Sequence, residues 1–209
     1  KHFGDAYWVW APQTIYDRKA KKYMIYFTLQ RNDRKSLITY YAYANKDFTG
    51  FENEPKQLFS AKYGSIDNDI IERDGTYHLF YKGTTKDENG KEVKNGIQQA
   101  TSKSLKGKWK EDFRYVDAYA GKTPVEGSSI FKLNGKDEYV LMYDMYTSGR
   151  YEYQTSTDLY HFSQPKAFTK DFFPRHGSVI SLARDEQHRL QEKRGYVVAY
   201  QHESQGIPI

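Results

Sequence analysis

Ionisable residues stand at the start of three predicted β-strands. The three segments are Ser65-Ile66-Asp67-Asn68-Asp69, Pro124-Val125-Glu126-Gly127-Ser128 and Pro174-Arg175-His176-Gly177-Ser178. Apolar residues and then a turn follow each segment, so the ionisable group lies where a strand begins rather than out on a loop. Carboxyl and imidazole groups held close together are suited to proton transfer. If the strands are arranged radially, these groups meet at one axis, which is the predicted active site.

An internal repeat supports a radial arrangement. Aromatic-rich strands are predicted at 23–27, 77–81 and 139–143, and a fourth copy at Gly195–Tyr200. Their tyrosines Tyr26, Tyr81 and Tyr143 recur at nearly equal intervals along the chain. The strand and turn that come next recur as well, at Asn45, Ser102 and Ser156, with a closely similar spacing. Two independent features therefore share one period.

Each repeat is predicted to be a small antiparallel sheet of about four strands. Dipeptides such as Asp74-Gly75 and Asn134-Gly135 favour tight hairpins because they tolerate positive φ. Small sheets that repeat at such an interval are typical of β-propellers. We place the innermost strands near Trp10, Asp67, Glu126 and His176, which gives about four blades. We expect an all-β, five-bladed propeller whose N-terminal blade is missing or incomplete, and helix only at 184–194.

Composition narrows the class of protein. A chain of 209 residues suits one domain, here residues 1–209, and 20 Tyr and 12 Phe favour half-buried strands and stacking against sugar rings. The net charge of +5 is spread among 27 acidic residues without a long basic run, which argues against nucleic-acid binding. No apolar run approaches the roughly 20 residues of a membrane span. The absence of Cys excludes disulfides and thiol catalysis.

Five short motifs, in order, resemble glycoside hydrolase family 43. They are Trp10-Ala11-Pro12-Gln13, Ile66-Asp67-Asn68-Asp69-Ile70-Ile71, Tyr77-His78-Leu79-Phe80-Tyr81-Lys82, Val125-Glu126-Gly127-Ser128 and Pro174-Arg175-His176-Gly177-Ser178-Val179-Ile180. The resemblance covers most of the chain, from about Tyr7 to Ile180. It implies a five-bladed propeller that acts as a β-xylosidase, α-L-arabinofuranosidase or arabinanase, with inversion at the anomeric carbon and no required cofactor.

The resemblance also implies catalytic roles. By position, Glu126 is similar to the general acid and Asp67 to the aspartate that tunes the pKa of that acid. The family's general base lies in an Asp-Pro stretch ahead of the Trp-Ala-Pro motif, and no such stretch precedes Trp10. Asp5 is the only acid upstream, and its context does not match. The first residues show neither a signal peptide nor an initiator Met, so we expect a mature or truncated product, with the base outside this chain.

Each of these residues also has a structural interpretation. Glu126 could be a solvated or capping residue at a strand end, although the small residues Gly127-Ser128-Ser129 beside it leave room for a ligand. Asp67 could close a turn, and Asp69 would point to the same side of the strand. We favour Asp67 for the tuning role and assign Asp69 to substrate binding.

The remaining candidates surround these carboxylates. Trp10 is suited to stacking on a pentose ring, or else to packing between blades. Arg150 and Arg175 could hold a carboxylate or a sugar hydroxyl, and we favour Arg150 because it begins a strand of the third repeat. The resemblance makes His176 a residue of the central channel, near the substrate or a structural calcium ion.

The leading functional prediction is a glycosidase that releases arabinose or xylose from plant polysaccharides or oligosaccharides. The alternative is a carbohydrate-binding propeller without turnover, which the missing base motif supports. The expected partner is a glycan, with neither nucleic acid nor membrane, and we expect an extracellular or periplasmic location. The choice between the two pentoses, between exo and endo action, and the oligomeric state stay open.

Overall fold

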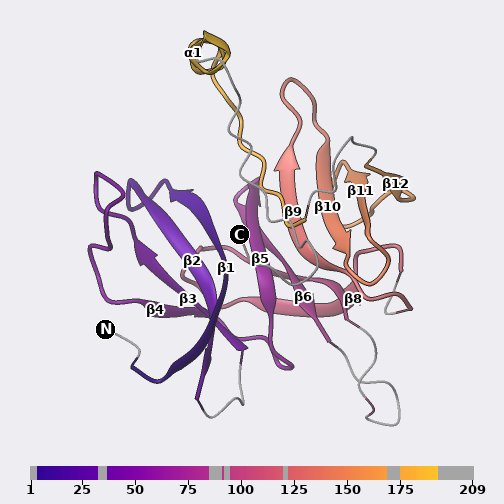
Figure 1. Ribbon diagram of the computed structural model, residues 1–209, viewed down its shortest axis with the longest axis horizontal. Coiled ribbons are helices and arrows are strands. Elements are labelled where there is room, and N and C mark those ends of the chain that lie inside the picture. The colour runs from indigo at the N-terminus through magenta and orange to yellow at the C-terminus, as the bar shows by residue number, and fades with distance from the viewer. Residues whose placement is uncertain are drawn as a thin grey trace.

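The computed structural model describes residues 4–32, 37–84, 91, 95–119, 122–168 and 175–192, the side chains of 190–192 excepted. Three four-stranded antiparallel sheets are followed by one helix, α1 (Arg184–Glu192), as Figure 1 shows. The first sheet contains β1 (Ala6–Asp17), β2 (Lys22–Arg31), β3 (Leu37–Tyr43) and β4 (Lys56–Phe59). The second contains β5 (Ile66–Arg73), β6 (Thr76–Gly83), β7 (Gly96–Ser102) and β8 (Lys110–Tyr115). The third contains β9 (Glu126–Lys132), β10 (Tyr139–Met145), β11 (Arg150–Ser156) and β12 (Lys166–Ala167).

The repeated tyrosines occupy equivalent positions in the three sheets. Tyr26, Tyr81 and Tyr143 lie in the second strand of their sheets, and each is fully buried. One apolar cluster joins the first sheet to the second, and another joins the second to the third. Successive sheets therefore pack face to face as propeller blades do, which confirms the predicted all-β fold.

The innermost strands are β1, β5 and β9, and β5 lies between the other two (Figure 1). Three of the four predicted inner strands are thus confirmed. The fourth prediction is wrong at His176, because residues 175–183 form no strand. The predicted fourth repeat at Gly195–Tyr200 lies outside the described residues. The helix forms where it was predicted, and α1 stands away from the sheets (Figure 1).

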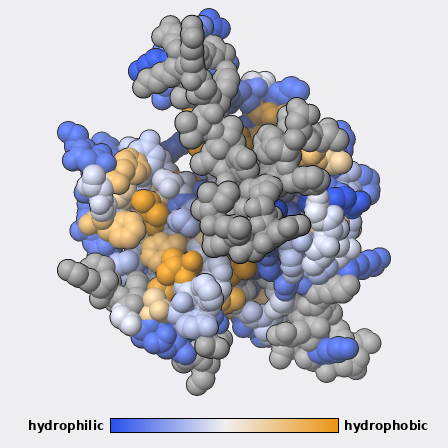
Figure 2. All heavy atoms as spheres, in the orientation of Figure 1, coloured by the Kyte–Doolittle hydropathy of each residue, from blue (hydrophilic) through white to orange (hydrophobic). Residues whose placement is uncertain are grey.

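Apolar side chains are unevenly distributed over the surface of the described residues. Figure 2 shows apolar side chains gathered over the sheet β1–β4, whereas hydrophilic side chains dominate the periphery. Of the described helical residues, none belongs to a segment long and apolar enough to cross a membrane.

Candidate active site

Each of the three inner strands carries an irregularity at the same level. The pairing register shifts in β1 between Trp10 and Gln13, in β5 between Ile66 and Asp69, and opposite the start of β9. A residue with positive φ lies at or beside each shift: Ala11 at 43°, Asp67 at 54° and Gly127 at 65°.

A β-bulge bends its strand and redirects the adjacent side chain, and such bulges are common beside active sites. Left-handed backbone is uncommon for a non-glycine residue and costs free energy. Positive φ also occurs in turns such as the one at Asp74, but at Ala11 and Asp67 it coincides with register shifts of inner strands, which makes this end of the sheets the candidate functional end.

A fourth segment, residues 175–178, crosses the same end without forming a strand. The amide of Gly177 donates to Tyr151 Oη at 3.1 Å, and Gln13 Nε2 donates to Ser178 Oγ at 2.8 Å. The segment is therefore attached to both the third and the first sheet. The ring of His176 lies so close to Gly127 that a Cβ there would stand 3.1 Å from it, which adds to the positive φ as a reason for glycine.

These four segments enclose a cavity of about 400 Å³. Its lining comprises Trp10, Ala11, Pro12, Gln13, Asp67, Asn68, Glu126, Gly127, Ser128, Arg175, His176, Gly177 and Ser178. The lining includes residues from all three segments whose ionisable groups were predicted to converge, and also the Trp-Ala-Pro-Gln motif. The cavity combines two carboxylates, a guanidinium and an imidazole with an indole ring, a set suited to holding a polar ring compound.

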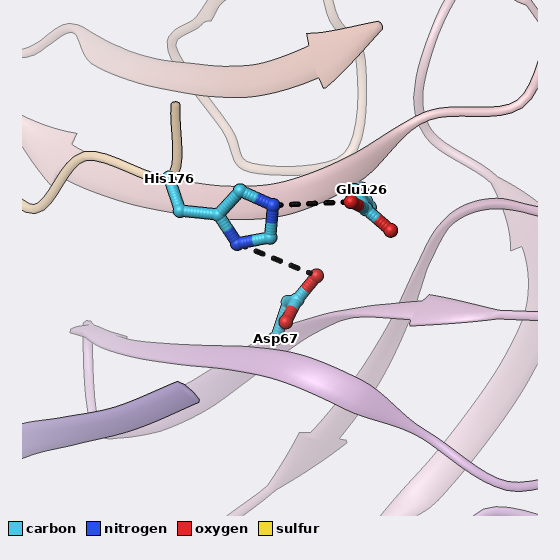
Figure 3. A group of neighbouring side chains, drawn as sticks. All are labelled: Asp67, Glu126 and His176. Atoms are coloured by element: carbon cyan, nitrogen blue, oxygen red, sulfur yellow. Dashed lines mark hydrogen bonds and ion pairs between the residues drawn. The ribbon is translucent and has the colours of Figure 1, made fainter. Parts of the chain in front are cut away.

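The imidazole of His176 lies between two carboxylates, as Figure 3 shows. Its Nε2 is 3.2 Å from Glu126 Oε1, and its Nδ1 is 3.8 Å from Asp67 Oδ2. Burial acts to lower the pKa of His176, but the hydrogen bond to Glu126 and the charges of Asp67, Glu126 and Asp144 outweigh it and raise that pKa. The protonated imidazolium is therefore favoured in this position.

Glu126 is held as a carboxylate. Lys82 Nζ lies 2.5 Å from Glu126 Oε2, and Arg175 Nη2 lies 3.8 Å from Oε1. Burial raises the pKa of Glu126, but the hydrogen bonds from His176 and Lys82 and their charges lower it to about 2. The general-acid role that the resemblance implies for Glu126 predicts the opposite, namely that Glu126 holds a proton and that Asp67 raises the pKa of Glu126. The cations on both sides of the carboxylate explain the difference.

Asp67 joins the second sheet to the third. Its Oδ2 accepts a hydrogen bond from the amide of Gly127 at 2.9 Å, and its backbone carbonyl accepts one from Ser128 Oγ at 2.5 Å. Burial raises the pKa of the Asp67 carboxyl, against the opposing effects of His176 and the Gly127 amide. Asp67 therefore carries its proton to a higher pH than Glu126 does.

Sequence reasoning missed two charged residues of this cluster. Lys82 lies within the aromatic strand β6, one residue before its end, and Asp144 is a buried charge within the otherwise largely apolar β10, where it lies opposite Glu126 in the strand register. Asp144 Oδ2 accepts a hydrogen bond from Arg175 Nε at 2.5 Å. A charge inside a strand of apolar residues was the available signal for both. With them, three carboxylates face three cationic side chains.

The other predicted residues divide between the cavity and its surroundings. Trp10 and His176 line it, whereas Asp69 is buried outside it, where Oδ2 accepts the Ile130 amide at 2.8 Å. Arg150 also lies outside the lining and pairs with Glu152 at 3.0 Å. The preference for Arg150 over Arg175 therefore disagrees with the structure, because the strand that Arg150 begins points it toward Glu152.

Asp5, the only acid upstream of Trp10, is also remote from the cavity lining. Its Oδ2 pairs with Arg31 Nη1 at 2.6 Å, at the end of the first sheet.

Asp67, Glu126 and His176 are also close enough to be considered as metal ligands, since their ligand atoms all lie within 4.8 Å of one another. Their arrangement does not fit one shared ion, because the two ring nitrogens of His176 face different carboxylates (Figure 3). Lys82 moreover occupies the second oxygen of Glu126. The calcium ion expected in the central channel stays a prediction.

Comparisons with known proteins agree with this geometry. The sequence profile of a family described as a probable glycosyl hydrolase domain, related to family 43, matches residues 4–188. An endo-arabinase from Bacteroides thetaiotaomicron VPI-5482 is similar in structure, with a TM-score of 0.52 and 18% identity over 78% of this chain and 57% of that one. A thermostable family-43 glycoside hydrolase has a TM-score of 0.56 and 20% identity over 85% of this chain and 62% of that one.

A structure with lower sequence identity but a higher TM-score extends the comparison. A fructofuranosidase from Schwanniomyces occidentalis, complexed with fructose, has a TM-score of 0.62 and 11% identity over 82% of this chain and 36% of that one. At these identities the structural similarities establish the fold alone. The chain spans less than two thirds of the length of each of these three proteins. A sequence comparison with curated proteins finds no significant match.

Proposed function

Because the chain belongs to the family of probable glycosyl hydrolase domains related to family 43, we propose that it hydrolyses glycosidic bonds to arabinose or xylose with inversion. The observation that carries this proposal is the cavity in which Asp67 and Glu126 meet from successive inner strands. Both are carboxylates, and inverting hydrolysis needs one carboxylic acid and one carboxylate around the scissile bond. The proposed location of the protein is extracellular or periplasmic, where such glycans are met.

In this proposal, Glu126 faces the oxygen of the leaving group. The glycosidic C–O bond breaks, the leaving oxygen takes a proton from Glu126, and a water oxygen bonds to the anomeric carbon from the opposite face. Glu126 is ionised in the free protein, so the proton must reach it, and the adjacent group that can donate one is His176, whose pKa is raised. The Asp67 carboxyl fixes the imidazole from the other side. Trp10 offers its indole to the apolar face of the sugar.

The residue that accepts the proton of the attacking water is not assigned. Among the described residues, Asp67 and Glu126 are the two carboxylates that line the cavity. Asp144 is bound to Arg175, and Asp5 pairs with Arg31.

The test is turnover by the wild-type protein and by Glu126→Gln of arabinobiose and xylobiose, whose sugar leaving groups need a proton; 4-nitrophenyl α-L-arabinofuranoside and β-D-xyloside, whose nitrophenolate leaves with little help from an acid, serve as the comparison. We expect Glu126→Gln to lose at least about a hundredfold in kcat/KM on the disaccharides, as is typical for a missing general acid. Glu72→Gln is the matched control, because Glu72 lies in the same strand as Asp67 but caps the exposed turn at Gly75, outside the cavity lining. Proton NMR of the released sugar reports inversion. Unchanged turnover of the disaccharides in Glu126→Gln would exclude its role as the acid.

A second candidate function is glycan binding without hydrolysis. The observation in its favour is the ion pair of Lys82 with Glu126, which removes the proton that a general acid needs. Calorimetry with arabino- and xylo-oligosaccharides separates the two functions. Binding by the wild-type protein without release of reducing sugar would favour the binding module over the enzyme.

A further inference from the structure

A second tryptophan adjoins the cavity on the same strand as Trp10. The indoles of Trp8 and Trp10 are stacked, with ring centroids 5.9 Å apart and an interplanar angle of 26°. Trp10 lines the cavity, whereas Trp8 lies outside the lining and is 51% exposed. Tyr7 packs edge-on against Trp8, with centroids 5.4 Å apart, and limits the movement of its ring. An ordered aromatic surface thus continues outward from the cavity.

The register of β1 against β2 shows which face this surface belongs to. Directly opposed residues of an antiparallel pair point to the same face. Trp10 opposes Thr28, whose hydroxyl donates to the carbonyl of Ser65 just before β5, and Trp8 opposes Gln30 two residues further along. Both indoles therefore lie on the face of the first sheet that is turned toward the second sheet and the cavity.

Two other exposed aromatic residues of this sheet, Tyr16 and Tyr23, lie on its opposite face. Tyr16 opposes Tyr23, out of step with Trp8 and Trp10, and their rings contact each other with centroids 5.0 Å apart. Tyr16 is 46% exposed, close to the value for Trp8. Exposed rings therefore lie on both faces of this sheet, and of these three Trp8 is the one stacked on a residue of the cavity lining.

We propose that Trp8 forms a second sugar-binding subsite next to the one at Trp10, so that the ligand is an oligosaccharide or polysaccharide chain. This inference rests on the proposed function, because it assigns the ligand of the same site. An exposed indole held in place by neighbouring rings offers a flat apolar surface at little cost in side-chain entropy, which suits the C–H face of a sugar. In this arrangement a single pentose occupies the subsite at Trp10, and the next sugar of a chain contacts Trp8.

The test compares short and long ligands in three variants. Binding of xylopentaose and arabinopentaose is measured by calorimetry, and KM is measured on the two 4-nitrophenyl pentosides. Trp8→Ala should weaken binding of the preferred pentaose about tenfold, which corresponds to about 1.4 kcal/mol, and should change KM for the pentosides less than about twofold. Tyr16→Ala, the matched control on the same strand, should leave both unchanged. Trp8→Phe keeps a ring at this position and should recover most of the affinity.

Tryptophan fluorescence gives an independent readout, because the chain has three tryptophans and Trp109 is packed against the apolar core. The pentaose should shift the emission of the wild-type protein to shorter wavelength by more than free xylose or arabinose does, because it covers Trp8 as well as Trp10, and Trp8→Phe should lose that difference. An equal loss for pentaose and pentosides in Trp8→Ala, or a loss for neither, overturns the subsite. If the wild-type protein cleaves pentosides but binds pentaose no more tightly, the subsite fails and the proposed function stands. If it neither binds nor cleaves any of these sugars, both fail.

Discussion

Replacement of Lys82 by methionine tests the electrostatic description of the site most directly. The side chains of Lys82 and Glu126 are 14% and 16% exposed, so their ion pair is largely removed from water. Methionine removes the charge but keeps an unbranched side chain, so that the contact with the ring of Tyr146, 4.7 Å from Lys82 Nζ, is largely preserved. The variant therefore isolates the charge from the packing.

The magnitude follows from the pKa of Glu126. An opposite charge this close lowers a carboxyl pKa by about 1–3 pH units, so the pKa of Glu126 should rise from about 2 to between about 3 and 5 in Lys82→Met. In the wild-type protein the lowered pKa is a source of stability above pH 4.5, the ordinary value, and this stability is lost as the pH falls to about 2. It amounts to roughly 3 kcal/mol at 1.4 kcal/mol per pH unit. In the variant it should shrink to about 2 kcal/mol or less.

Carbon-13 NMR of the glutamate side-chain carboxyl groups between about pH 2 and pH 7 measures this pKa without any substrate. The spectrum of Glu126→Gln identifies the resonance. Lys132→Met is the matched control: Lys132 pairs with Asp137 at 2.9 Å and both side chains are well exposed, so the pKa of Glu126 should stay unchanged in this variant. A pKa of Glu126 that moves by less than about half a pH unit in Lys82→Met would refute the ion-pair explanation.

Three further substitutions test other parts of the described structure. Asp69→Asn should lower the free energy of unfolding in urea by about 1–3 kcal/mol, because the side-chain amide has one oxygen where the carboxyl has two that accept backbone N–H groups. Burial raises the pKa of Asp69 to about 7, so the wild-type protein should lose stability as the pH rises from 3.8 to about 7. Asp69→Asn should flatten this dependence, and an unchanged slope would contradict the explanation. Burial lowers the pKa of His78 to about 4, so stability should be lost as the pH falls from 6.5 toward 4, and His78→Gln should remove that loss. His176→Gln should abolish or displace the basic limb of the kcat/KM profile, and an unmoved limb would exclude His176 as the proton source.

The sequence was sufficient to predict the blades because their signal is local and repeated. Tyr26, Tyr81 and Tyr143 each mark a second strand that is buried between neighbouring sheets, and such burial requires an apolar run of fixed length. The convergence of Asp67 and Glu126 could be predicted for the same reason, since both begin inner strands of successive blades. In a radial fold, residues at equivalent positions of successive repeats lie close together in space.

The charge state of the site could not be predicted in this way. Lys82 and Glu126 are far apart in the sequence and belong to different strands of neighbouring sheets. Whether a lysine at the end of one strand reaches a carboxylate at the start of another depends on the packing of the two sheets. The choice between Arg150 and Arg175 failed for a related reason, because the segment of Arg175 forms no strand and its position depends on contacts with the first and third sheets.

The position of the proton links the site's geometry to its chemistry. Three cationic side chains face three carboxylates at this site. Of the two carboxylates that line the cavity, Glu126 has a lower pKa than Asp67, because Glu126 contacts both Lys82 and His176. In the proposed reaction, a sugar oxygen that approaches Glu126 competes with Lys82, and His176, whose pKa the surrounding carboxylates raise, is the neighbouring proton donor. The proposed acid function is therefore divided: Glu126 positions the proton at the leaving group, and His176, fixed between Glu126 and Asp67, supplies it.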